Sequence, residues 1–224
     1  ANNALVGNGL SVVTMCYLRR CLIFFRKILL NIDDEYLNIS NEVVDWFEDL
    51  ASILTSDKKT SYLKAKDPEL RMKIIRQLGE AFSDYREKIY KKGFSGKQKL
   101  KLQKIDKFLE LTASWLTETI RTNKENNLFH AYNIIRSEKN HSIAFVDNLF
   151  PMLEGQVAVL SSGVISSDES IELLENLFKS KMFSSDQNSF MLYPEKDVTS
   201  FMEKNIIPAD LITQNELLSK MVIQ

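Results

Sequence analysis

The chain has 224 residues and a net charge of −1, and 44% of its residues are hydrophobic and 26% charged. This composition excludes disorder as the dominant state, and the length suits one large domain or two small ones. Its seven glycines and four prolines provide few turns for a compact sheet, whereas long helices need few. We therefore predict an all-α fold of antiparallel helical hairpins.

The start of the chain lacks the features of a secretion signal. It opens with Ala1-Asn2-Asn3 rather than methionine, and no basic, apolar and small-residue segments follow in the order that such signals need. We expect the chain to be one region of a larger protein, with the other domains of that protein as its partners.

The first predicted element is a helix in the apolar run Leu10–Leu30. A membrane span needs about 20 predominantly apolar residues, and Arg19 and Arg20 in the middle of the run make insertion costly. A buried or interfacial helix is the better interpretation, and no transmembrane span is expected. Cys16 and Cys21 lie on different faces of this helix, so we predict free thiols, which suit a reducing compartment and favour the cytoplasm.

Two further helices follow from capping residues and from apolar residues spaced three and four apart. Asn38 or Ser40 is expected to cap a helix that continues to residue 54. Asp67 followed by Pro68 provides an N-cap with proline at the first helical position, and the helix should end before Gly93.

A capping box is predicted at Ser95 and Gln98, where it would open a helix that ends at Ile120. This helix and the preceding one would form a hairpin about the Gly93–Gly96 turn. Nine basic residues lie between Arg86 and Lys107. We interpret them as the solvated tip of the hairpin and expect no nucleic-acid partner, because stacking aromatics at regular spacing are missing.

The remainder of the chain is predicted to be helical with two irregular parts. Ser167 is expected to cap one helix, and Pro151 to break another, because proline lacks an amide donor. Domain regions are expected at 1–121 and 122–224, in one compact unit. In full, the predicted segments are a loop at 122–127, helices at 128–135, 143–160, 167–178, 197–204 and 212–222, and a loop at 184–194.

Metal and cofactor chemistry has no support in the sequence. His130 and His141, the only histidines, have no cysteine or carboxylate at metal-ligand spacing. The glycine-rich nucleotide motifs and the nucleophile elbow are missing. We expect neither a metal nor a cofactor.

Candidate ligand-binding residues gather in the last third of the chain. Glu154, Asp186 and Glu195 are carboxylates that could form an acid–base pair, although a separation of about 5 to 10 Å would be needed for glycoside cleavage. Loop carboxylates and core aromatics are the alternative interpretation of these positions. The candidate site residues are Glu154, Gln156, Asp186, Gln187, Tyr193 and Tyr132.

The segment Met152–Ser170, followed by Leu173, Leu174 and Leu177, resembles a helical hairpin of the six-hairpin (α/α) toroid enzymes, particularly the cellobiose phosphorylase group. The segment 186–208 looks like a tail that accompanies such a hairpin in large bacterial carbohydrate-active proteins. This resemblance implies oligosaccharide, with inorganic phosphate in phosphorylases, as the ligand class, and it places Gln156 near the rim.

The chain has fewer predicted helices than a closed toroid and no counterpart of that group's catalytic acid motif, so a complete active site is not expected. We predict a helical module of a larger carbohydrate-active protein that contributes to sugar binding or to architecture. On this hypothesis, Tyr193→Ala and Gln156→Ala weaken sugar binding and leave the fold intact. The alternative is a non-catalytic helical scaffold for docking between domains or proteins.

Overall fold

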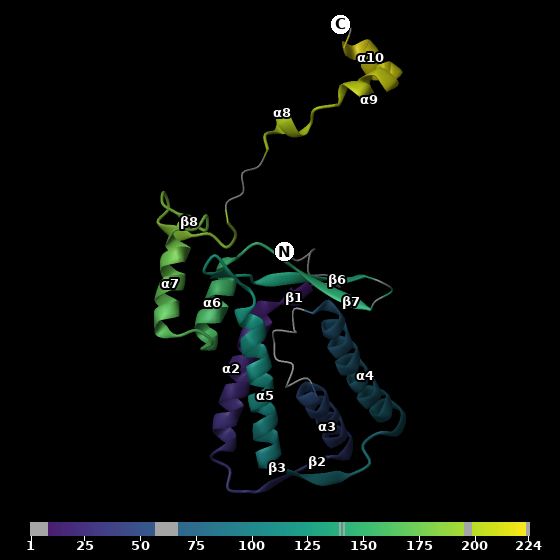
Figure 1. Cartoon of the computed structure of the whole chain (residues 1–224), viewed down its shortest axis with the longest axis vertical. Helices are drawn as coiled ribbons and strands as arrows, with labels where there is room; N and C mark the ends of the chain where they lie inside the picture. The colour runs from purple at the N-terminus through teal and green to yellow at the C-terminus, as the bar shows by residue number, and fades with distance from the viewer. Residues whose placement is uncertain (1–8, 57–66, 139, 141, 195–198, 223–224) are drawn as a thin grey trace. The chain divides into compact units, whose positions relative to one another are not determined.

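Two antiparallel helices, α2 (Val12–Leu29) and α5 (Leu102–Arg121), run side by side through the structure, a computed structural model (Figure 1). The structure describes residues 9–56, 67–138, 140, 142–194 and 199–222. Residues 1–194 form one compact unit and residues 195–224 a second. The predicted boundary at residue 121 lies inside the first unit.

The elements of the first unit combine helices with short strands. The other described helices are α3 (Asn41–Ser56), α4 (Pro68–Lys92), α6 (Leu153–Ser162) and α7 (Ser167–Phe178). The described strands are β1 (Gly9–Ser11), β2 (Tyr36–Ser40), β3 (Lys97–Lys101), β4 (Lys124–Glu125), β5 (Leu128–Phe129), β6 (Tyr132–Glu138), β7 (Ile143–Asn148), β8 (Phe183–Ser184) and β9 (Ser189–Phe190). In the second unit, the structure describes the short helices α8 (Phe201–Lys204), α9 (Ala209–Gln214) and α10 (Glu216–Val222).

The prediction of an all-α fold is wrong. The structure is about 59% helical and 18% strand, and its strands form four small antiparallel sheets. The largest has the order β1-β6-β7, and the pairs β2-β3, β4-β5 and β8-β9 form the others. The fold is therefore mixed, with the three-stranded sheet at one end of the α2–α5 pair and the β2–β3 ribbon at the other (Figure 1).

Four helices, α2, α3, α4 and α7, have the predicted positions. Helices α2 and α3 occupy the two apolar segments expected to be helical. The Asp67 carboxylate accepts hydrogen bonds from the amides of Glu69 and Leu70 at the start of α4, with proline at its first position. Helix α4 ends at Gly93, whose φ of 69° lies in the left-handed region that glycine adopts freely.

The predicted capping box at Ser95 is wrong, because residues 97–101 form strand β3 and α5 begins at Leu102. The Ser95 amide and hydroxyl both donate hydrogen bonds to the Glu42 carboxylate, which ties this turn to the start of α3. Pairing of β3 with β2 satisfies the backbone of this segment instead. The pairing also places Lys99 and Lys101 over the ring of Tyr36.

The predicted helices at 128–135 and 143–160 are also corrected. Strands β5, β6 and β7 occupy most of this sequence, and α6 begins only at Leu153, after the proline. Both apolar runs are short, and a short run fits a strand as well as a helix. Asn126, Asn127 and Asn140 have positive φ, and asparagine tolerates that conformation in tight turns.

Smaller corrections concern the last helices. Ser166, not Ser167, caps α7, and with Glu169 it forms a complete capping box. Within the helix predicted at 197–204, the structure describes the short helix α8. Two short helices, α9 and α10, take the place of the single helix predicted at 212–222.

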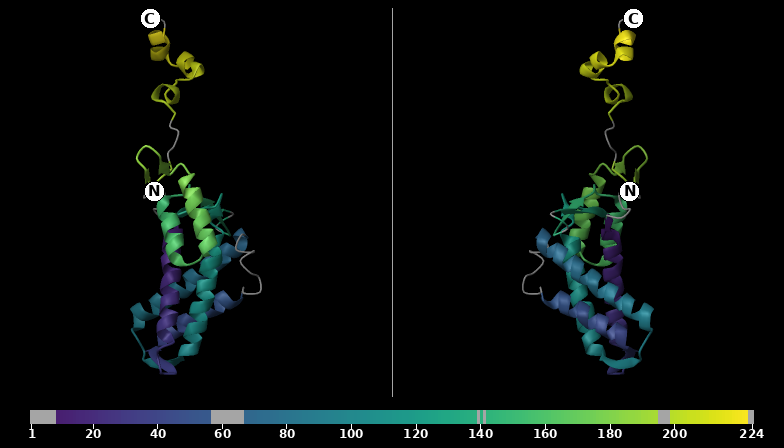
Figure 2. Two further views of the ribbon diagram at one scale, coloured as in Figure 1. Left: turned by 90° about the vertical axis from the view of Figure 1, so that its left-hand side faces the viewer. Right: turned by 90° about the vertical axis from the view of Figure 1, so that its right-hand side faces the viewer.

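The core of the first unit lies where α2, α5, α6 and α7 meet the strands. Its largest side chain, Phe129, is 1% exposed. The other buried members are Val12, Cys16, Ile120, Ala158, Val159, Val164 and Leu173. Figure 2 shows α6 and α7 side by side along one side of this unit.

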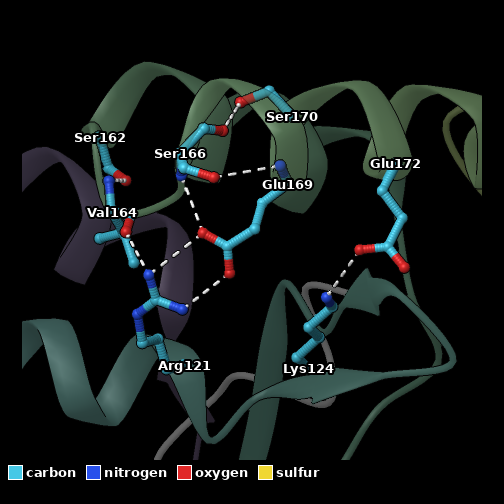
Figure 3. Close-up of polar contacts among 8 residues, drawn as sticks. All are labelled: Arg121, Lys124, Ser162, Val164, Ser166, Glu169, Ser170 and Glu172. Atoms are coloured by element: carbon cyan, nitrogen blue, oxygen red, sulfur yellow. Dashed lines mark hydrogen bonds and ion pairs between the residues drawn. The ribbon is translucent and has the colours of Figure 1, made fainter.

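Two arginines hold the end of α6. Arg19 of α2 donates to the carbonyl oxygen of Ser162, the last residue of α6, at 2.6 Å. Arg121 of α5 donates to the carbonyl of Val164 at 2.9 Å and forms a two-pronged ion pair with Glu169 (Figure 3). Carbonyls at a helix end have no partner within the helix, so these arginines join α2 and α5 to the α6–α7 turn.

Acid should weaken the Arg121–Glu169 pair in a defined pH range. The pair and the capping bond lower the pKa of Glu169 from 4.5 to about 2, so its contribution to stability is full above pH 4.5 and falls as pH drops towards 2. We expect Glu169→Gln to lower the urea midpoint at pH 7 and to match the wild type near pH 2.

The matched control for that experiment is Glu172→Gln. Glu172 lies 3.5 Å from Lys124 and makes no capping bond (Figure 3), so its replacement should change the midpoint less, since exposed ion pairs contribute little. Equal effects of the two substitutions at every pH would contradict the assigned role of Glu169.

Candidate functional site

Three of the sequence-predicted site residues converge at the start of α6. Tyr132 begins β6, Glu154 lies in the first turn of α6, and Tyr193 follows the β8–β9 hairpin. After burial, the Glu154 carboxylate and then Tyr193 raise the pKa of Tyr132, so the three side chains are neighbours. Phe150 contacts Tyr193 edge to face, with ring centroids 6.2 Å apart. We call these four residues the tyrosine platform.

Backbone contacts hold the platform together. The amide of Leu153 donates to the carbonyl of Leu192 at 3.1 Å, which ties the loop of Tyr193 to α6. The amide of Leu149 donates to the carbonyl of Tyr132 at 3.1 Å, which fixes the segment that carries Phe150. The platform is therefore built from three separate stretches of chain.

The platform offers hydroxyls, a carboxylate and aromatic surface to a ligand. Burial first, and then the hydrogen bond to Glu154, raise the pKa of Tyr132, so its phenol stays protonated at neutral pH. Tyr193 is 42% exposed and can present its ring to solvent. This combination suits a neutral ligand with many hydroxyl groups, because aromatic side chains join an apolar face to a polar tip.

Asp186 and Gln187 lie apart from these contacts, in the turn of the β8–β9 hairpin. Both are exposed, and their described hydrogen bonds are local, to the hydroxyls of Ser185 and Ser189. The hairpin is supported by Phe190, whose ring packs against those of Phe178 and Phe183, so Phe190 has a packing role. Glu195 and His141 lie outside the described residues.

Gln156 is fully buried, at 0% exposure. Its side-chain oxygen accepts from the amide of Phe129 at 2.9 Å. Its side-chain nitrogen donates to the carbonyls of Phe129 and Met152 at 2.7 and 2.9 Å. The whole amide group is therefore bonded to backbone, and the side chain holds the start of α6 against β5 instead of lining a rim.

The adjacent glycine explains why α6 approaches the strands so closely. A Cβ atom at Gly155 would lie 3.0 Å from the Cβ of Ala131 and 3.1 Å from its Cα, a distance at which backbone would have to move. The Gly155–Gln156 pair is thus a packing signal, and the sequence interpretation treated it as part of a rim.

A second candidate site is an apolar surface along α2, the apolar first helix that motivates the docking alternative in the sequence. Its six residues share one exposed face of the helix and none is charged. The exposed fractions of its five large side chains run from 40% for Ile28 to 60% for Phe24, and the sixth residue, Cys21, is also exposed. We call this set the α2 stripe, and its members are Tyr17, Leu18, Cys21, Phe24, Phe25 and Ile28.

The charged residues of α2 explain the outward position of the stripe. Arg19 points inward, donating to the Thr117 hydroxyl at 2.7 Å as well as to α6. About two turns further along α2, Arg26 forms a two-pronged ion pair with Asp106, at 2.7 and 3.2 Å. Two inward arginines seven residues apart leave the apolar residues on the opposite face.

The described residues bear on three further features, which are membrane spans, cysteines and metal ligands. The described part of the chain contains no helix of the length and apolarity that crossing a membrane requires. Cys16 is buried and Cys21 exposed, and both are free thiols, as predicted. Over the same described residues, no three His, Cys, Asp or Glu side chains are grouped to hold a metal ion.

Comparison with known proteins finds no family model that matches the chain and no curated protein that matches its sequence.

Replacing Gln156 tests its structural role. Gln156→Ala should lower the free energy of unfolding by about 3 kcal/mol, because it leaves buried backbone groups of Phe129 without partners. Urea denaturation of the purified chain would measure the change. The matched control is Gln187→Ala, an exposed site where the change should stay within about 0.5 kcal/mol. A small loss at Gln156 would contradict its assignment to the interior.

Proposed function

We propose that this chain is a non-catalytic helical scaffold that docks through the α2 stripe against a helix of another domain or protein. The single observation that carries the proposal is the stripe itself, six exposed uncharged residues along one helix face. A contiguous apolar surface on a soluble protein marks an interaction site more often than not. The stripe is therefore the surface with the strongest reason to be covered.

The partner surface is best matched by a helix. The stripe residues recur at intervals of three, four and seven positions, so they follow the axis of α2 in a straight band. A second helix laid along this band would bury every member of it, as helices do in pairwise packing. This agrees with a role in the architecture of a larger protein.

A second candidate function is contact with oligosaccharide, favoured by the tyrosine platform. From the sequence, Glu154 was chosen as a possible acid–base carboxylate and Tyr132 and Tyr193 as rings that could stack on sugars. The resemblance of residues 152–177 to a hairpin of sugar-active toroid enzymes adds the ligand class. Their convergence at one place supports that choice, and Phe150 adds a third aromatic ring. A contact of this kind would position a sugar chain and leave the chemistry to another domain.

The docking proposal predicts that a charged residue can replace a stripe residue without destabilising the folded chain. Phe25→Glu should change the free energy of unfolding by no more than about 0.5 kcal/mol, because Phe25 is 49% exposed. It should also reduce binding of the dye anilinonaphthalene sulfonate, which reports exposed apolar surface. Denaturation curves and dye fluorescence measure the two effects.

The control for the dye is Tyr90→Glu on α4, where a lone aromatic is 76% exposed, and dye binding should be unchanged. A loss of stability of 2 kcal/mol or more at Phe25, on the scale of a buried aromatic, would mean that the stripe packs within the chain and would remove the basis of the docking proposal.

The sugar-contact candidate predicts a loss of affinity at Tyr193. In a thermal-shift screen with cello-oligosaccharides, with and without phosphate, a bound sugar raises the melting temperature. Tyr193→Ala should weaken that binding about tenfold, the effect of losing one aromatic contact of about 1.4 kcal/mol. Phe94→Ala, at a 61% exposed ring in another turn, is the control. No shift with any sugar would count against this function.

A further inference from the structure

We infer that residues 91–101, which we call the basic tip, bind the surface of an anionic lipid bilayer and insert the ring of Phe94 among the headgroups. The basic tip consists of the last two residues of α4, the Gly93–Gly96 turn and strand β3. It belongs to the end of the first unit that carries the β2–β3 ribbon, away from the three-stranded sheet (Figure 1). The inference goes beyond the docking function and uses no residue of the α2 stripe.

The basic tip has a high density of positive charge. Residues 91–101 read Lys-Lys-Gly-Phe-Ser-Gly-Lys-Gln-Lys-Leu-Lys, with five lysines and no acidic residue. Among the described residues, two of the five lysines have an acidic partner within ion-pair distance, one at each end of the segment. The three lysines without such a partner in the described structure are Lys92, Lys97 and Lys99.

Pairing with β2 turns the lysines of β3 towards solvent. Successive residues of a strand face opposite sides, and Leu100 is buried, so Lys97, Lys99 and Lys101 share the outer face, about 7 Å apart along the strand. Their partners on β2 are uncharged. The ring of Tyr36 lies 5.8 and 5.6 Å from the ammonium groups of Lys99 and Lys101. The ribbon therefore presents a row of cations on one face.

The acidic residues that adjoin the ribbon lie at its other end. Asp33, Asp34 and Glu35 come just before β2. The first residue of β2 pairs with the last residue of β3, whereas the turn adjoins the first residue of β3, about 13 Å away along the strand. Positive charge is therefore concentrated around the turn.

The turn presents Phe94 to solvent on an anchored backbone. The amide of Ser95 donates to the Glu42 carboxylate at 2.8 Å. The amide of Asn41 donates to the carbonyl of Gly96 at 3.1 Å. Phe94, next to these anchors, is 61% exposed, so most of its ring is available to a partner.

This combination fits a lipid surface better than it fits nucleic acid. Lysines near an anionic bilayer are attracted to it, and aromatic rings concentrate at the headgroup level. Single-stranded nucleic acid is bound by several rings on which successive bases stack, and the basic tip offers one. Its cations are all lysines, which lack the two-pronged contacts of arginine with phosphate. The arginine nearest in sequence, Arg86, lies over the rings of Phe82 and Tyr90 instead.

Cosedimentation of the full chain with vesicles tests the inference. We expect binding to vesicles of phosphatidylcholine mixed with phosphatidylserine, and much weaker binding to phosphatidylcholine alone. Added salt should release the protein, because salt screens exposed charges. Lys97→Ala and Lys99→Ala should each weaken binding about fivefold, the effect of removing one lysine at an anionic surface. The matched control is Lys179→Ala on α7, whose side chain is 74% exposed; it removes the same charge and should have no effect.

Replacing Phe94 separates insertion from charge attraction. Phe94→Ala should weaken vesicle binding and leave its salt dependence unchanged, because no charge is removed. The fluorescence of Phe94→Trp should move to shorter wavelength when phosphatidylserine vesicles are added, because the ring enters less polar surroundings. The wild type supplies the background from Trp46 and Trp115.

Four results would overturn the inference. The first is no preference for phosphatidylserine vesicles at low salt, and the second is equal weakening by Lys179→Ala. The third is tighter binding to single-stranded DNA than to vesicles, with no fluorescence shift of Phe94→Trp on lipid. The fourth is loss of vesicle binding in Phe25→Glu while the lysine variants still bind, which would move the contact to the α2 stripe. The docking function itself is tested separately, by Phe25→Glu without lipid.

Discussion

The inward position of Arg19 is the constraint on which the other features depend. Its guanidinium is partly buried between α5 and α6, where burial lowers its pKa, and it is retained because it donates to Thr117 and to the end of α6. Removing a partner from a buried charge is strongly destabilising. Once this side chain faces inward, the rotation of α2 is fixed, and the stripe must face outward.

The same contact positions the candidate site at the other end of α6. Arg19 holds the last residue of this helix, Arg121 holds the turn that follows it, and Gln156 holds its first turn against β5. The helix is thus fixed at both ends by polar groups of other elements. Glu154, one of the platform residues, takes its place from a helix that has little freedom to move, which suits a binding surface.

Local signals in the sequence predicted part of this structure correctly, and long-range pairing explains the rest. The start of α4 depends on Asp67 and Pro68, which act within one turn, and the position of that helix is confirmed. Strand β3 depends on β2 and on the bond from Ser95 to Glu42, 53 residues away in the sequence, and no spacing rule anticipates that bond. Strands β6 and β7 likewise satisfy each other's backbone hydrogen bonds by pairing. Their apolar runs do not reveal this pairing in the sequence, and they were therefore predicted as helices.

For the site, the sequence identified residue types better than their roles. Tyr132, Glu154 and Tyr193, three of the six candidates from the sequence, lie together, whereas Asp186 and Gln187 lie apart in the β8–β9 turn. Gln156 is also polar, but its side chain faces inward. The close approach of Ala131 to Gly155 shows that this end of α6 packs against the strands. The apolar character of α2 motivated the docking alternative from the sequence, but the sequence did not show which of its residues face outward, because that depends on the inward contacts of Arg19 and Arg26.

The most direct test of this account is the reactivity of the two thiols in the folded, dilute protein. Because Arg19 fixes the rotation of α2, Cys21 faces solvent and Cys16 lies in the core. We expect a maleimide reagent to label Cys21 rapidly and Cys16 only after denaturation, with peptide mass analysis to assign the sites. Labelling of both thiols at similar rates, or of Cys16 first, would contradict the orientation of α2 and with it the docking surface.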